Sequence, residues 1–292
     1  MFKPRRASVR TAIAILATLV VAAAIVTLTA VYTYRHAPVP QRPPMTSPHS
    51  APPPQNADLA AEFTQLARSV NATMALAVTA VGSNQPPTIY GDWQQGAAWS
   101  TIKVPLAIAA YRQQHTITAT MQATITESDN TAAEALWQQL GDPVTAAGKV
   151  QEVLRENGDP TIVESRKLRP QFTAFGQTIW SLADQAHFIA QAFCNKQYDP
   201  IFALMGQIVP QQRWGIGALP GAQFKGGWGP SPAEKYLVRQ FGVVNSGRLA
   251  VAIAAEPASG SFDDGTRALD EVAAWLSVRL PQLPAGGCPG NT

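Results

Sequence analysis

In the part of the chain after residue 57, strand-like segments form one group near the start and another near the end. Helical patterns separate these two groups. Strands from both ends can join one sheet only if the intervening helices form a separate lobe. The order is helix, two strands, a helical block, three strands and a helix. It predicts an α/β (α+β) fold, an antiparallel five-stranded sheet flanked by helices with an inserted all-helical lobe. The predicted strands are residues 73–81, 88–93, 224–229, 236–244 and 249–255.

The predicted helices carry apolar residues at spacings of three and four. The first helix begins at Asp58 and places Leu59, Phe63 and Leu66 on one face. The last helix places Leu269 and Leu276 inward in the same way. The predicted ranges are residues 58–70, a helix from Ser100, and residues 131–140, 143–158, 181–193 and 263–280.

The first 57 residues have a different character. Residues 1–10 are basic, and residues 11–34 contain no charged side chain, which is long enough to span a bilayer. Residues 35–57 are rich in proline and predict an extended linker. We therefore expect a cytoplasmic N-terminus, a single-pass anchor in the cell membrane and an extracytoplasmic domain over residues 58–292. A cleaved signal, giving a secreted protein, is the alternative.

Charge and cysteine content exclude several classes of function. The net charge of +3 is too small to predict a nucleic-acid partner. The two cysteines form no C-x-x-C motif, and two of the four histidines lie in the proline-rich stretch, so we expect no metal site and no cofactor. In an oxidising compartment Cys194 and Cys288 would form a disulfide that ties the C-terminal tail to the 181–193 helix. Two unpaired thiols are the alternative.

Ser100 and Lys103 stand at the start of an apolar helical run. Residues three apart on a helix lie on one face, so the hydroxyl and the amine can approach each other. A serine becomes a nucleophile when a neighbouring base takes its proton, and a buried lysine with a lowered pKa can be that base. The S-x-x-K spacing is common by chance, however, and needs support from other motifs.

Two further motifs follow in order, Ser128-Asp129-Asn130 and Lys225-Gly226-Gly227. Taken singly, the first is also typical of a helix N-cap and the second of a turn. Together with Ser100-x-x-Lys103 they resemble the motifs of the class A serine β-lactamases and the penicillin-binding proteins. The flanking residues and the order of elements extend this resemblance from Asp58 to Leu280.

The resemblance implies a role for each motif residue. Ser100 would be the acylated nucleophile, Lys103 its proton acceptor, and Ser128 the proton donor to the leaving nitrogen. Asn130 would bind the substrate amide, and the backbone N–H groups of Ser100 and Trp228 would form the oxyanion hole. Lys225 would supply positive charge beside Ser128 and the substrate carboxylate. The remaining substrate-binding residues would be Gly227 and, in the position of a carboxylate-binding arginine, Lys235.

The sequence departs from the family pattern in three ways that bear on function. Gly226 stands where serine or threonine is usual, so a hydroxyl that would bind a carboxylate is missing. Ser100 and Ser128 lie closer together than in class A, which predicts a shortened helical lobe. The glutamate motif E-x-x-L-N is absent. Glu164 is the candidate base for deacylation, and a solvated loop carboxylate is the alternative.

These features lead to two functional hypotheses. The first is a membrane-anchored serine hydrolase or acyltransferase that acts on β-lactams or peptidoglycan peptide amides through an acyl-Ser100 intermediate. The second is a protein of the same fold that binds cell-wall peptide without turnover. The sequence leaves the natural substrate and the oligomeric state open.

Overall fold

The computed structural model describes residues 55–290. The predicted membrane segment 11–34 and most of the predicted linker lie outside this range. Within residues 55–290 no helix combines the length and the apolar character needed to cross a bilayer.

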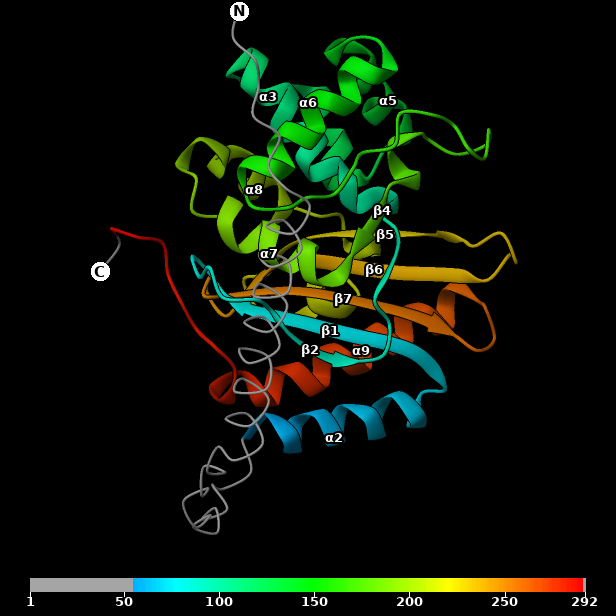
Figure 1. Cartoon of the computed structure of the whole chain (residues 1–292), viewed down its shortest axis with the longest axis vertical. Helices are drawn as coiled ribbons and strands as arrows, with labels where there is room; N and C mark the ends of the chain where they lie inside the picture. Colours follow the sequence, from blue (N-terminus) through cyan, green and yellow to red (C-terminus); the bar gives the residue numbers. More distant parts are fainter. Residues whose placement is uncertain (1–54, 291–292) are drawn as a thin grey trace, which may run out of the picture. The chain divides into compact units, whose positions relative to one another are not determined.

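The centre of the fold is a five-stranded antiparallel sheet, as the strand pattern predicts (Figure 1). The structure gives the strand order β2-β1-β7-β6-β5. Register is set by buried pairs; Leu76 of β1, for example, lies opposite Tyr90 of β2 and Ile253 of β7. Because β5 is an edge strand, one side of its backbone is left unpaired by the sheet. The strands are β1 Ala72–Ala80, β2 Thr88–Gly91, β5 Gln223–Pro230, β6 Tyr236–Val244 and β7 Leu249–Pro257.

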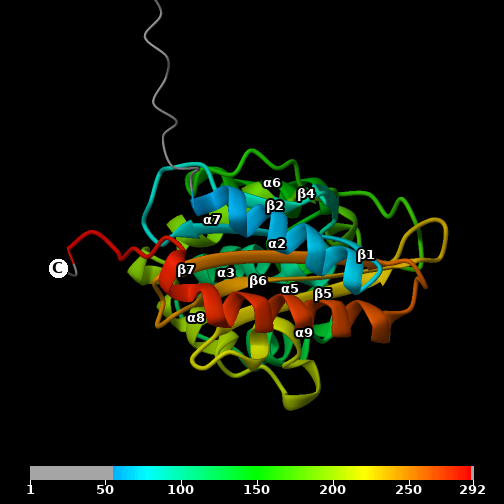
Figure 2. The same ribbon diagram turned by 90° about the horizontal axis from the view of Figure 1, so that it is seen from below.

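Helices cover both faces of the sheet. The N-terminal helix α2, Gln55–Ser69, and the C-terminal helix α9, Phe262–Arg279, lie together beneath it (Figures 1 and 2). Helix α7, Leu182–Ala192, packs on the opposite face against β1, β6 and β7. Leu59 and Phe63 of α2 are buried, as their spacing predicts, although the helix begins at Gln55 rather than Asp58.

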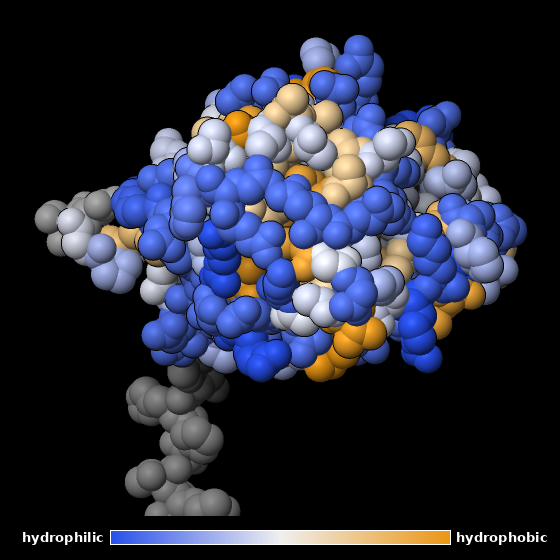
Figure 3. All heavy atoms as spheres, turned by 90° about the horizontal axis from the view of Figure 1, so that it is seen from above, coloured by the Kyte–Doolittle hydropathy of each residue, from blue (hydrophilic) through white to orange (hydrophobic). Residues whose placement is uncertain are grey.

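The inserted lobe is helical and lies above the sheet (Figure 1). Seen from above, hydrophilic side chains dominate its surface and hydrophobic ones appear in small patches (Figure 3). Its elements are α3 Lys103–Gln114, α4 Ala119–Gln122, the π-helical turn η2 Ala123–Glu127, α5 Asn130–Leu140, α6 Pro143–Glu156 and α8 Asp199–Met205.

The sequence pattern did not predict a second, two-stranded sheet. Strand β3, Gln95–Ala97, pairs with β4, Ile179–Ser181, immediately before the Ser100 turn. Strands of three residues carry too little hydrophobic alternation to be recognised. Ser181, expected at the start of a helix, ends β4 and caps α7 by accepting a hydrogen bond from the Asp184 N–H.

Candidate active site

Ser100 lies on a tight 3₁₀ turn, η1 Trp99–Ile102, that leads directly into α3. Trp99 holds a left-handed backbone conformation with φ of 50°, which is uncommon for a residue other than glycine. The turn is fixed from behind, because the Ala98 N–H donates to the Thr178 carbonyl oxygen at 2.7 Å. Ser100 itself is half-buried at the edge of a cleft.

Arg239 of β6 supports this turn, and sequence reasoning did not single it out. Its guanidinium is completely buried and donates to the carbonyl oxygens of Gly96, Ala97 and Trp180 at 3.0–3.2 Å and to the Gln185 Oε1 at 2.8 Å. Burial lowers the pKa of Arg239 to about 9. The side chain thus holds β3 and β4 together just before Ser100.

Lys103, three residues after Ser100, lines the same cleft and is buried, with only 1% of its surface exposed. Its Nζ donates to the Ser128 carbonyl oxygen at 2.6 Å and to the Asn130 Oδ1 at 2.7 Å, and it lies 3.4 Å from the Ser128 Oγ. Burial lowers the pKa of Lys103 to about 7, although the charge of Asp129 opposes the shift. The lowered pKa makes the neutral amine, which can accept a proton, accessible near neutral pH.

The Ser128-Asp129-Asn130 segment serves the site and the helix at once. The π-helical turn η2 is followed by Ser128, which caps it with a left-handed φ of 60°. Asp129 turns away and caps α5 by accepting a hydrogen bond from the Ala132 N–H at 2.8 Å. Its two neighbours are then free to face Lys103, so the capping role and the active-site role coexist.

Lys225 brings the edge strand β5 to this cluster. Its Nζ is completely buried and donates to the Ser128 Oγ at 2.8 Å and to the Gly226 carbonyl oxygen at 2.9 Å. Burial, together with the charge of Lys103, lowers the pKa of Lys225 well below its ordinary value. The Ser128 hydroxyl therefore lies between two amines, an arrangement that suits proton transfer.

Gly227 allows β5 to approach the nucleophile. A Cβ at this position would lie 2.8 Å from the Ser100 backbone nitrogen and 2.9 Å from the Ala98 oxygen, so only glycine fits. The next residue, Trp228, lines the cleft. The structure thus brings the turn that carries Ser100 next to β5. These are the two backbone segments expected to form the oxyanion hole.

The cleft has a volume of about 510 Å³ and includes Ser100, Lys103 and Asn130 in its wall. Glu134, one helical turn after Asn130 on α5, also lines it and forms an ion pair with Lys167 at 3.2 Å. Glu134 is the carboxylate that the sequence reasoning missed, although its spacing of four from Asn130 places both on one helix face. Aromatic side chains complete the walls: Trp99, Phe172, Trp228 and Tyr236.

Two predicted site residues lie apart from this cluster. Glu164 is bound to its neighbour Arg166, whose N–H and Nε donate to the carboxylate at 2.8 and 3.1 Å; these hydrogen bonds lower the pKa of Glu164. Lys235 is exposed in the turn between β5 and β6, with its stem against Gly260. Neither residue lines the cleft.

Comparisons with solved structures show the fold. No protein-family profile matches the sequence, and no curated protein matches it. The β-lactamase from Streptosporangium roseum superposes with a TM-score of 0.59 at 15% identity, covering 78% of this chain and 100% of that one.

Two further structures agree. A class A β-lactamase from Bacteroides cellulosilyticus gives a TM-score of 0.62 at 14% identity, covering 77% of this chain and 98% of that one. The β-lactamase from Sphaerobacter thermophilus gives 0.59 at 18%, covering 78% and 98%. The described part of the chain therefore has the serine β-lactamase fold, in the form found in class A.

Proposed function

We propose that this protein is a membrane-anchored serine hydrolase or acyltransferase that forms an acyl-Ser100 intermediate with β-lactams or cell-wall peptide amides. The observation that carries the proposal is the hydrogen-bonded chain from Lys103 through Ser128 to Lys225 at the cleft that contains Ser100. The anchor would be the uncharged segment 11–34.

The proposed chemistry has two acylation steps followed by hydrolysis. The neutral Lys103 amine takes the Ser100 hydroxyl proton as the oxygen attacks the carbonyl carbon of the substrate. The carbon–nitrogen bond then breaks, and the leaving nitrogen receives a proton from Ser128, which regains one from the Lys103 ammonium. Water later cleaves the ester and restores the Ser100 hydroxyl.

The first experiment asks whether Ser100 becomes acylated. The full-length chain, purified in detergent, is incubated separately with a fluorescent penicillin and with the phenyl ester of phenylacetylglycine. Adducts are located by peptide mass spectrometry. We expect an adduct on Ser100 and none in the Ser100→Ala protein. Absence of both an adduct and any hydrolysis, with either reagent, would overturn the proposal and favour binding without turnover, which is the second hypothesis.

We propose Glu134, rather than Glu164, as the residue that activates the hydrolytic water. Glu134 lines the cleft, where Lys167 pairs with it, whereas Glu164 lies outside the cleft and is bound by its neighbour Arg166. Glu134→Gln is therefore expected to slow hydrolysis of the acyl-enzyme by about a hundredfold while acylation continues. The measurement is the decay of the acyl adduct by intact-protein mass spectrometry.

Glu164→Gln is the matched control for this prediction, because it removes the same charge outside the cleft. We expect it to change the decay rate by less than about twofold, within the usual range of a surface substitution. Equal slowing by both variants, or slowing by Glu164→Gln alone, would contradict the assignment.

A further inference from the structure

Ser128 identifies the side of the active site on which the leaving group departs. If Ser128 gives its proton to the leaving atom, that atom must lie above its hydroxyl, next to Lys225 and Gly226. Gly227 presses against the Ser100 nitrogen, so the backbone of residues 225–227 borders the reaction on this side. The chemical character of this border decides which leaving groups are accepted.

The indole of Trp214 occupies this border. A Cβ at Gly226 would lie 3.2 and 3.4 Å from the Cη2 and Cζ2 atoms of the Trp214 ring. The ring also packs edge-on against Trp228, with centroids 5.9 Å apart. The open cleft extends away from this border: its wall includes Asn130 and Glu134, but neither Trp214, Ser128 nor Gly226.

Three hydrogen bonds hold the Trp214 segment in place. The buried Gln240 of β6 donates from its Nε2 to the Trp214 carbonyl oxygen at 2.7 Å and accepts from the Ile216 N–H at 2.9 Å. The Gly215 N–H donates to Asp270 of α9 at 2.6 Å. The backbone that carries the indole is therefore fixed by the fold, and the ring itself packs against Trp228 and Phe262.

The same border offers little to an anion. Gly226 supplies no hydroxyl, and the Lys225 amine is completely buried, with its pKa lowered by burial. Arg213 is turned away, over the Phe224 ring and toward the Gly206 carbonyl oxygen. A carboxylate placed here would lose its hydration without gaining charge-assisted hydrogen bonds.

We propose that the substrate of this protein has a leaving group without a carboxylate, and that Trp214 over Gly226 excludes carboxylate-bearing leaving groups. This inference rests on the proposed acyl transfer at Ser100 and narrows it. The preferred substrate class is uncharged acyl esters or internal amides, recognised through the acyl side of the cleft. Terminal peptide residues and β-lactams with a free carboxylate are then poor substrates.

A pair of esters that differ in one group tests the inference. The full-length chain is given the phenyl ester and the 3-carboxyphenyl ester of phenylacetylglycine, and kcat/KM is measured for each. We expect the carboxylate to give no gain, with the neutral ester equal or faster. A tenfold or greater preference for the carboxylated ester would overturn the inference.

A double variant provides the complementary test. Trp214→Ala with Gly226→Ser opens the border and adds a hydroxyl donor, and hydrogen bonds to charged groups contribute enough to change rates about tenfold. We expect the ratio of carboxylated to neutral ester turnover to rise about tenfold over that of the unaltered protein. An unchanged ratio in a folded double variant would count against the inference.

Binding to the Ser100→Ala protein separates this inference from the proposed function. Quenching of tryptophan fluorescence gives dissociation constants for both esters without chemistry. If the unaltered protein neither forms an adduct nor hydrolyses the esters, the proposed acyl transfer is overturned, but the leaving-group inference is not. Binding of the carboxylated ester at least tenfold tighter than the neutral one would overturn the leaving-group inference alone.

Discussion

Replacing Lys103 with arginine is expected to slow acylation of Ser100 by about a thousandfold, because arginine keeps the positive charge but cannot act as a base. In the unaltered protein, burial lowers the pKa of Lys103 to about 7. The acylation rate should therefore rise about tenfold per pH unit below 7, as the neutral amine becomes available, and level off above it. The measurement is the rate of adduct formation from pH 5 to 9.

Protein stability provides a second readout for Lys103. Its folded pKa lies below the unfolded value, so between about pH 7 and 10.5 the unfolded chain binds more protons than the folded protein does. The free energy of unfolding should therefore rise with pH across this window. In Lys103→Met, which fits a buried site, this rise should be smaller. The assignment would be contradicted if Lys103→Met folded and still acylated Ser100 at the unaltered rate.

The sequence predicted the centre of the site because its chemistry is carried by short local motifs. Ser100 and Lys103 are one turn apart. The positions of Ser128 and Asn130 are set by Asp129, which caps α5 between them. The five strands were also recognisable: β1, β5, β6 and β7 each have a run of buried residues, and the short β2 follows a turn directly after β1. The meeting of Lys225 with Ser128 came from the resemblance, since no local pattern predicts a contact between such distant residues.

The rest depends on tertiary contacts that leave little trace in the sequence. Lys235 was placed by counting along a strand, but the chain turns at residues 231–235 and leaves it exposed. Trp214 lies in an irregular segment whose position is set by Gln240 and Asp270. Glu164 was chosen for its place in a loop, yet Glu134 reaches the cleft because α5 presents it one turn after Asn130.

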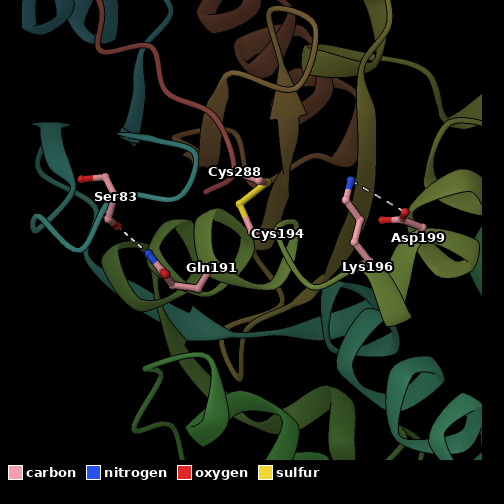
Figure 4. The surroundings of a disulfide bond; sticks show 6 residues. All are labelled: Ser83, Gln191, Cys194, Lys196, Asp199 and Cys288. Atoms are coloured by element: carbon pink, nitrogen blue, oxygen red, sulfur yellow. Dashed lines mark hydrogen bonds and ion pairs between the residues drawn. A yellow bond between two sulfur atoms is a disulfide. The ribbon is translucent and has the colours of Figure 1, made fainter. Parts of the chain in front are cut away.

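The predicted disulfide is present and should contribute strongly to stability. Cys194, just after α7, is bonded to Cys288 in the C-terminal tail, with a sequence separation of 94 (Figure 4). The closed loop contains α8, β5, β6, β7 and α9, so the bond restricts a large part of the unfolded chain. For a loop of this length the entropic stabilisation is roughly 3 to 4 kcal/mol after allowance for native-state effects. The predicted pairing of the two cysteines is therefore confirmed, and the alternative of two unpaired thiols is wrong.

The double variant Cys194→Ser with Cys288→Ser should therefore unfold about 10 °C below the unaltered protein, given the usual sensitivity of a domain of this size. Thermal unfolding followed by circular dichroism measures the shift. The unaltered protein in reductant should match the variant, and the variant should not respond to reductant.

Other contacts still hold the tail, including the Gly286 N–H to the Arg248 carbonyl oxygen at 2.9 Å and the buried Leu283. Because neither cysteine lines the cleft, acylation of Ser100 at low temperature should be unchanged. Equal unfolding temperatures for variant and unaltered protein would mean that these contacts, not the disulfide, fix the C-terminal segment.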